Sequence, residues 1–144
     1  RAVPSGLALD FYAVEDAQAL QTRLARILEK NDVLLLVSSP ALFNAESARF
    51  ILLSSYRLGR PVIGPDAAFV KAGSLASVYA SNAAVLAAIR RQLDYFAGHA
   101  TFLPPVFPLP EITVNDHVAH AFDMDVMSPA RLLDRLGVEH VSPA

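Results

Sequence analysis

The 144-residue chain contains no cysteine, which excludes disulfide bonds, thiol catalysis and cysteine-ligated zinc. A chain of this kind is compatible with any compartment, including an oxidising periplasm. Charge is also sparse, since only 18% of the residues are charged, the formal net charge is -2, and the basic residues are scattered. Because nucleic-acid binding requires a basic stripe against the phosphates, we expect no nucleic-acid partner.

Long apolar runs are absent as well. Residues 33–37 form one of the longest, and it is far too short to cross a bilayer. No signal peptide opens the chain, which begins at Arg1 rather than at a methionine, so we expect that an upstream segment was removed or not included. With 53% hydrophobic residues, the chain has enough apolar surface for the core of one ordinary domain.

Strand-like and helix-like patterns alternate along the first hundred residues. This order predicts a Rossmann-like α/β lobe, a three-layer doubly wound parallel sheet of four or five strands with helices on both faces. The strand at residues 33–37 is wholly apolar, so we expect it to be central and inaccessible. Strands are expected at residues 7–14, 33–37, 62–63 and 74–81, and helices at 15–31, 45–58 and 82–98, with a loop or short helix from Gly64 to Val70. The first helix is expected to bury Leu20, Leu24, Ile27 and Leu28, and the last to be capped by Asn82 and closed by Gly98.

The chain divides into two parts at about residue 100. Residues 1–100 form the expected α/β ligand-binding lobe. Residues 101–110 are rich in proline, so we interpret residues 101–144 as an extended hinge or crossover segment with a short strand at 111–114 and two short C-terminal helices. Asn115 is the expected cap of the first helix and Pro129 the expected start of the second. These helices are expected to pack on the same lobe or on a partner.

Polar side chains lie on or next to the loops that follow the expected strands. Right-handed crossovers place these loops on one edge of a parallel sheet, where ligands of such sheets bind. The side chains offer hydroxyl, carboxylate and amide groups to a small polar solute. The alternative is that the loop serines and Asn82 only cap helices. The candidate ligand-binding residues are Ser38, Ser39, Asp66, Ser77, Tyr79, Ser81 and Asn82.

Three stretches, in this order and spacing, resemble the substrate-binding family of ABC transporters (type 1 periplasmic-binding-protein-like), whose better-known members bind aromatic amino acids. They are DVLLLVSSP at residues 32–40, GRPVIGPDAAFVKAGSLAS at 59–77, and LPPVFPLPEITVNDHVAHAFDMDVMSPARLLDRL at 103–136. The resemblance implies the C-terminal lobe of a two-lobed solute-binding protein, located in the periplasm or otherwise outside the cytoplasm. It implies a small-molecule solute, an N-terminal lobe and a membrane permease as partners.

The chain departs from the family at positions that contact the ligand. Where the family often has Asp-Asn after the strand at 33–37, this chain has Pro40 and Ala41. Where the family often has Asp-Tyr after the strand at 74–81, this chain has Ser81 and Asn82. Because neither proline nor serine supplies a charge to an ammonium group, we do not expect an amino acid to be held in the family's usual way.

Motifs for catalysis, cofactors and metals have little support. The chain has no G-x-S-x-G or H-E-x-x-H motif, and we expect neither an enzyme nor a cofactor. The Lys71-Ala72-Gly73 stretch lacks the rest of a phosphate loop, so we interpret it as a turn that requires a positive φ at the glycine. His117 and His120 share a predicted helix face, but no further ligand is indicated, so we expect no metal.

Two functional alternatives stay open beside uptake. The same fold could serve as an extracytoplasmic sensor of a signalling protein, or as a protein-interaction domain with an altered ligand site; a small hydrolase or transferase is opposed by the missing nucleophile. Apolar side chains in the proline-rich segment, namely Phe102, Val106, Phe107 and Leu109, are expected to form an exposed patch. We therefore hypothesise a homodimer through residues 102–114.

Overall fold

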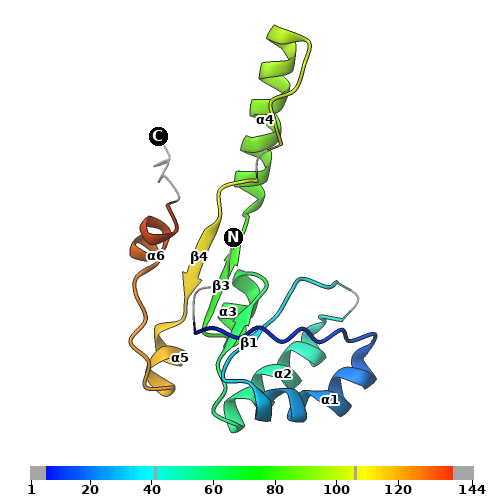
Figure 1. The fold of residues 1–144 in the computed structure, drawn as a ribbon, viewed down its shortest axis with the longest axis vertical. Helices are drawn as coiled ribbons and strands as arrows, with labels where there is room; N and C mark the ends of the chain where they lie inside the picture. Colours follow the sequence, from blue (N-terminus) through cyan, green and yellow to red (C-terminus); the bar gives the residue numbers. More distant parts are fainter. Residues whose placement is uncertain (1–5, 41, 106, 138–144) are drawn as a thin grey trace.

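The chain forms an α/β lobe from which one long helix projects (Figure 1). A computed structural model describes residues 6–40, 42–105 and 107–137. Its single four-stranded sheet has the order β1-β2-β3-β4, with β1 to β3 parallel and β4 antiparallel to β3, and the predicted α/β class is confirmed. The elements are α1 (Ala17–Lys30), β1 (Leu34–Leu35), α2 (Ala45–Arg57), β2 (Val62–Gly64), α3 (Ala67–Ala72), β3 (Ala76–Tyr79), α4 (Asn82–His99), β4 (Glu111–Val114), α5 (Asp116–Ala121) and α6 (Pro129–Leu136).

The core lies between the sheet and helices α1 and α2. The Asp16 side chain caps α1 by accepting a hydrogen bond from the Ala19 amide at 2.7 Å. One face of α1 is apolar, and all four of its predicted core positions are buried. The buried cluster consists of Leu20, Leu24, Leu28, Ile51 and Val62, with Leu34, Leu36 and Phe43 among the half-buried residues packed against it.

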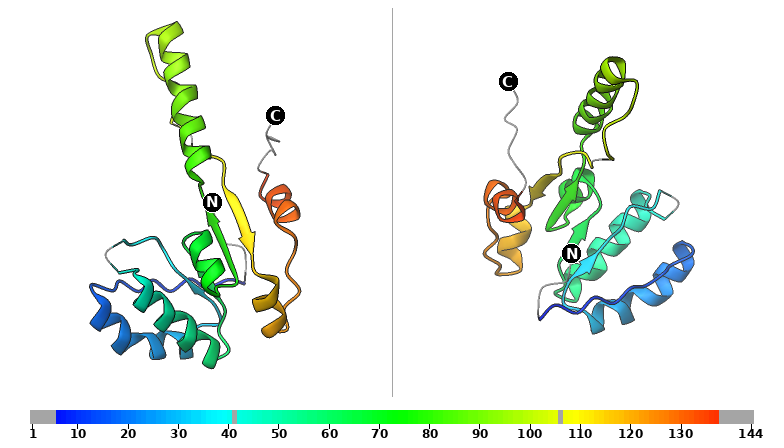
Figure 2. Two further views of the ribbon diagram at one scale, coloured as in Figure 1. Left: turned by 180° about the vertical axis from the view of Figure 1, so that it is seen from behind. Right: turned by 45° about the horizontal axis from the view of Figure 1, so that its top comes forward.

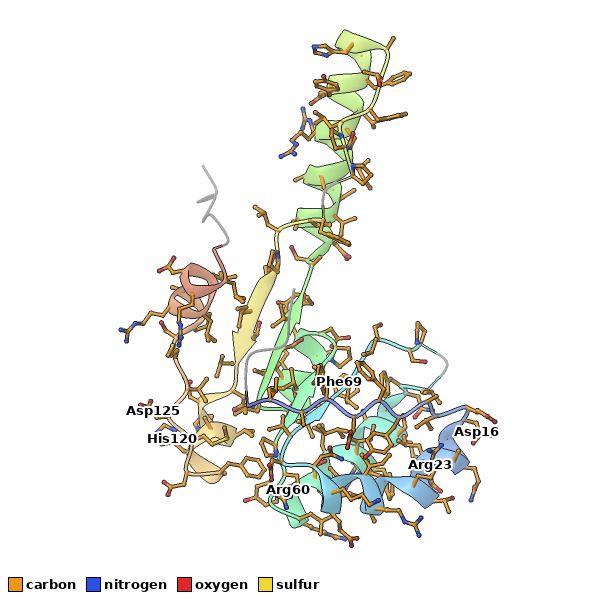
Figure 3. All side chains as sticks on the ribbon, viewed as in Figure 1. Asp16, Arg23, Arg60, Phe69, His120 and Asp125 are labelled. Atoms are coloured by element: carbon orange, nitrogen blue, oxygen red, sulfur yellow. The ribbon has the colours of Figure 1, made fainter. Side chains whose placement is uncertain are left out.

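Helix α3 packs very close to β2, and glycine makes this approach possible. A Cβ atom at Gly64 would lie 2.5 Å from the Cβ of Phe69 and 2.9 Å from the Ser74 hydroxyl. Phe69 lies in the middle of the lobe (Figure 3) and meets the edge of the Phe43 ring at a centroid distance of 5.4 Å. At the end of α3, Gly73 has a φ of 123°, as the predicted turn required.

Two predictions about the sheet are wrong. Residues 7–14 are extended but form no strand, and residues 33–37 contribute only the edge strand β1 rather than a central one. Leu35 and Val37 are 61% and 76% exposed, so this segment is not inaccessible. The physical reason is pairing, because β1 is hydrogen-bonded to β2 on one side and to no other strand of the described residues.

The two faces of the sheet are covered unequally. Side chains alternate between the faces of a strand, so Leu34 and Val62, which pack against α1 and α2, place their neighbours Leu35 and Ile63 on the opposite face. On that face Leu35 is 61% exposed, and Val78 of β3 is 52% exposed. The helices α1, α2 and α3 therefore bury one face, while apolar side chains on the other stay in contact with solvent.

Helix α4 extends away from the lobe (Figures 1 and 2) and has no buried residue. Its cap is Ser81, whose hydroxyl accepts from the Ala84 amide at 3.2 Å, so the predicted cap at Asn82 is off by one residue. The predicted end at Gly98 is also corrected. The helix continues through His99, and Ala100 adopts the left-handed conformation with a φ of 52°.

The C-terminal segment is fastened to the lobe through Asn115. Its backbone amide donates to the Leu75 carbonyl at 2.8 Å, and its side-chain amide donates to the Val70 carbonyl at 3.0 Å. Its side-chain oxygen caps α5, as predicted, by accepting from the Val118 amide. Pro129 begins α6, also as predicted. Within the described part of the chain, no helix is both long and apolar enough to span a bilayer.

The close approach at Gly64 generates a stability prediction. Replacing Gly64 with alanine should lower the free energy of unfolding by about 2–3 kcal/mol, because the added methyl group overlaps backbone-proximal atoms of α3. The matched control is Gly98→Ala in α4, where no atom lies within 4 Å of the added Cβ and the change should be neutral or stabilising by up to about 1 kcal/mol. Urea denaturation of both variants measures the difference; equal effects would contradict this packing.

Candidate functional site

The carboxyl ends of β1, β2 and β3 meet at one edge of the sheet, because the three strands are parallel. Ser38 and Ser39 follow β1, Asp66 follows β2, and Ser81 follows β3. The structure therefore brings the loops of these predicted site residues to the same edge. Ser38, Asp66 and Asn82 are exposed, whereas Ser39 and Ser81 are half-buried.

Asp66 has a structural role that can coexist with ligand contact. One carboxylate oxygen, Oδ1, accepts a hydrogen bond from the Phe69 amide at 3.0 Å and so caps α3. The other oxygen has no hydrogen-bond partner among the residues that the structure describes, and the residue is exposed. Asp66 thus presents a fixed negative group at the strand-end edge.

The serines at this edge are held by local turns. The Ser39 carbonyl accepts from the amides of Leu42 and Phe43, each at 3.0 Å, which folds the loop after β1 into a turn. The Ser81 hydroxyl caps α4. The capping alternative therefore applies to Asp66 and Ser81. Asn82 is instead the first residue of α4, and its exposed amide is free of any cap role.

Ser77 and Tyr79 do not face the strand-end edge. Ser77 has no exposed surface, and its hydroxyl has no hydrogen-bond partner among the described residues. The Tyr79 hydroxyl lies 3.3 Å from the Thr113 hydroxyl and 3.4 Å from a carboxylate oxygen of Glu111, so it is turned toward β4. The Tyr79 contacts follow from the pairing of β3 with β4, which the sequence pattern did not predict.

The strand-end edge is open rather than enclosed. The described cavities are lined elsewhere: one of about 390 Å³ lies along α4 and the segment after it, and one of about 260 Å³ lies between residues 8–14 and β1. Neither of these two cavities, nor a third beside Arg23 and a fourth beside His120, is lined by the predicted site residues. The edge is thus a single wall that carries hydroxyl, amide and carboxylate groups, without a second wall to enclose a ligand.

The histidines of α5 do not form part of a recognisable metal site. The His120 ring nitrogen Nδ1 lies 2.7 Å from the Asp116 carbonyl, and both His117 and His120 are exposed. His120 and Asp125 lie on the C-terminal segment at the side of the molecule, away from Phe69 (Figure 3). Across residues 6–40, 42–105 and 107–137, no group of three or more acidic or histidine side chains is placed to hold a metal ion.

Comparison with known proteins supports the fold. No model of a protein family matches the chain, and no curated protein matches it. The ABC domain in complex with L-Trp from Streptococcus pneumonia is similar in structure, with a TM-score of 0.65 and 18% identity over 86% of this chain and 42% of that one. A conserved domain protein from Vibrio cholerae O1 biovar El Tor is similar with a TM-score of 0.58 and 13% identity over 81% of this chain and 40% of its own length.

These comparisons show that the chain shares its α/β fold with part of each of the two structures. The chain spans less than half the length of either similar structure, so the remainder of those proteins has no counterpart in it.

The cap at α3 can be separated from the charge of Asp66 by mutation. Asp66→Ala should lower the free energy of unfolding by about 1 kcal/mol, because the Phe69 amide loses its acceptor. Asp66→Asn should stay close to the original stability, since asparagine caps helices as well as aspartate does. Thermal unfolding followed by circular dichroism checks both variants. Equal loss in the two would show that the charge, rather than the cap, stabilises the loop.

Proposed function

We propose that this chain binds a small polar solute, without catalysis, as one lobe of the substrate-binding component of an ABC-type uptake system outside the cytoplasm. The observation that carries the proposal is the open strand-end edge with Ser39, Asp66 and Ser81. The similar Streptococcus structure, described as an ABC domain in complex with L-Trp, supports solute binding on this fold. Transport itself is inferred from the sequence resemblance.

A second lobe supplies the missing wall in this proposal. The chain covers 42% of the similar ABC domain, which leaves room in that protein for another lobe. Helix α4 departs from the end of β3, at the edge where the candidate residues lie (Figure 1), and none of its residues is buried. A lobe packed around α4 would therefore lie over the strand ends. Hinge closure between the lobes would then enclose the solute.

The polar groups at the edge define which solutes fit. Asp66 provides an oxygen that accepts hydrogen bonds, and the Ser39 and Ser81 hydroxyls can donate or accept. In the turn after β1, Pro40 supplies neither a charge nor a hydrogen-bond donor, and Ala41 lies outside the described residues. We therefore propose a neutral or weakly basic solute with hydroxyl or amide donors, rather than an amino acid held through paired charges.

A sensor domain of a signalling protein is the second candidate function. The altered residues at the family's ligand positions, Pro40 and Ser81 among them, favour it. The coding sequence around this chain separates the two candidates. A lipoprotein signal with another lobe upstream would support uptake, whereas a downstream transmembrane helix followed by a kinase or cyclase domain would support sensing.

Solute binding can be tested on the 15.5 kDa chain by NMR. Titration of the ¹⁵N-labelled chain with L-tryptophan, a nucleoside or a monosaccharide at millimolar concentration should give saturable shifts for at least one solute in the backbone amides of Ser38, Ser39, Gly64, Asp66 and residues 79–82. Asp66→Asn should weaken that affinity by roughly tenfold, because a charged acceptor becomes neutral while the cap is kept.

The matched control is Asp94→Asn on α4, which neutralises another exposed carboxylate whose only described ion pair is the long 3.9 Å contact with Arg90. This variant should bind as the original chain does. Saturable shifts confined to other parts of the molecule would refute the site, and the absence of shifts with every solute would refute solute binding by the lobe.

The uncovered surface of α4 predicts association of the isolated chain. Leu93, Phe96, Phe102 and Phe107 are 57%, 43%, 59% and 99% exposed, and the Phe96 and Phe102 rings stack at 4.7 Å. The dimer hypothesised from the sequence forms through residues 102–114, of which Val106 lies outside the described residues. We extend the surface that two copies would cover for each other to Leu93 and Phe96 of α4. Light scattering at micromolar concentration should give the mass of a dimer, and Leu93→Glu combined with Phe107→Glu should give a monomer.

The control for this association is Arg91→Glu, a charge change at an exposed position of α4. It should leave the dimer intact. A chain that is monomeric at every concentration, or a dimer that persists in the double variant, would contradict association through this surface.

A further inference from the structure

The outer edge of β1 presents unpaired backbone groups. The Leu34 and Leu36 amides donate to the Pro61 and Ile63 carbonyls of the β2 side, each at 3.0 Å. Because amide groups alternate in direction along a strand, the backbone groups of Leu35 point to the other edge. No backbone hydrogen bond to that edge is found within the described residues. An edge of this kind is a template for a further strand.

A groove runs along this edge. Its cavity of about 260 Å³ is lined on one side by residues 33–37 and on the other by residues 8–12 and Val14. Residues 7–14 are extended and unpaired, with Leu9 50% and Phe11 90% exposed. An extended segment therefore flanks the groove on each side. A strand placed there would have a potential hydrogen-bonding partner on each side.

The two walls limit what can enter. An occupant must be a strand that is free along both edges, because the extended segment closes the side opposite β1. The outermost strand of a second copy has one edge already paired within its own sheet, so a second copy does not fit this description. The apolar residues that line the groove, among them Leu9, Leu24 and Leu35, require an apolar strand.

The uncovered face of the sheet indicates that a helix comes after that strand. The β1-α2-β2 connection runs from β1 toward β2. A connection from a strand in the groove to residues 7–14 would run the opposite way, away from β2. Right-handed crossovers then put its helix on the face opposite to α2. That is the face on which Leu35 is 61% and Val78 is 52% exposed. A strand followed by a helix would thus cover both the edge and the face.

We infer that the groove between β1 and residues 7–14 receives an apolar strand parallel to β1, continuing into a helix over Leu35, supplied by the same polypeptide upstream of this chain. An upstream source is favoured because residues 7–14, which border the groove, precede α1 in the chain. A strand and helix that lead directly into these residues would come before them in the sequence. The similar structures, of which this chain covers 42% and 40%, are long enough to contain such a unit. The inference does not depend on solute binding.

The test compares the 144-residue chain with the polypeptide that its gene encodes, including the upstream residues. Leu35→Asp should change the melting temperature of the 144-residue chain by less than about 3 °C, because Leu35 is exposed there. In the longer polypeptide the same change should lower the melting temperature by about 10 °C, because the carboxylate would be buried beneath the helix. Hydrogen exchange of the Leu35 amide should be at least about 100-fold slower in the longer polypeptide.

The control is Leu53→Asp on the outer side of α2, where leucine is 47% exposed. Leu53→Asp should change the melting temperature by the same small amount in both polypeptides. Equal effects of Leu35→Asp in the two, or equal exchange of the Leu35 amide in the unsubstituted proteins, would overturn the inference. A gene that encodes no strand and helix upstream would overturn it as well, and protection of Leu35 by a different protein would refute the source proposed here.

Discussion

Burial of one face of a short parallel sheet beneath three helices holds this lobe together. Leu24 and Leu28 are each 1% exposed and Ile51 has no exposed surface, and together they cover Val62 of β2. Each such side chain contributes about 1.5–3 kcal/mol when buried. Helix α3 extends the same layer only because Gly64 lets Phe69 approach the strand. The position of the strand-end loops, and with them the candidate site, depends on this one-sided core.

The helices could be predicted from the sequence because their signals are local. The apolar positions of α1, from Leu20 to Leu28, recur at helical spacing and are buried as that spacing indicates. Asn115 and Pro129 mark the starts of α5 and α6 through their own backbone and side-chain chemistry. The errors in α4, at Asn82 and Gly98, amount to one residue at each end, where serine competes for the cap and alanine takes the left-handed turn.

The strands could not be predicted as well, because a strand requires a partner that the pattern does not contain. Residues 7–14 and 33–37 have the composition of buried strands, yet one forms no strand and the other lies at the edge. The apolar pattern indicates that both faces of these segments can be buried, whereas helices of the described chain cover only one face of the sheet. The contacts of Tyr79 with Glu111 and Thr113 have the same origin, since they result from pairing with β4, which is distant in sequence.

The uncovered apolar surfaces lie in two places, on the sheet and on α4, and covering each would have a different consequence. The edge of β1 and the face that carries Leu35 and Val78 lie on the sheet itself, so a strand and helix placed there complete the core and affect stability. Helix α4 leaves the lobe at the end of β3, so a partner that packs around it would lie over the strand ends and, in the proposed function, would enclose the solute. No described residue belongs to both surfaces. A strand and helix could therefore cover the sheet while the strand-end edge stays exposed to solvent. The lobe would then fold first as a unit, and solute binding would be controlled separately by the partner that encloses α4.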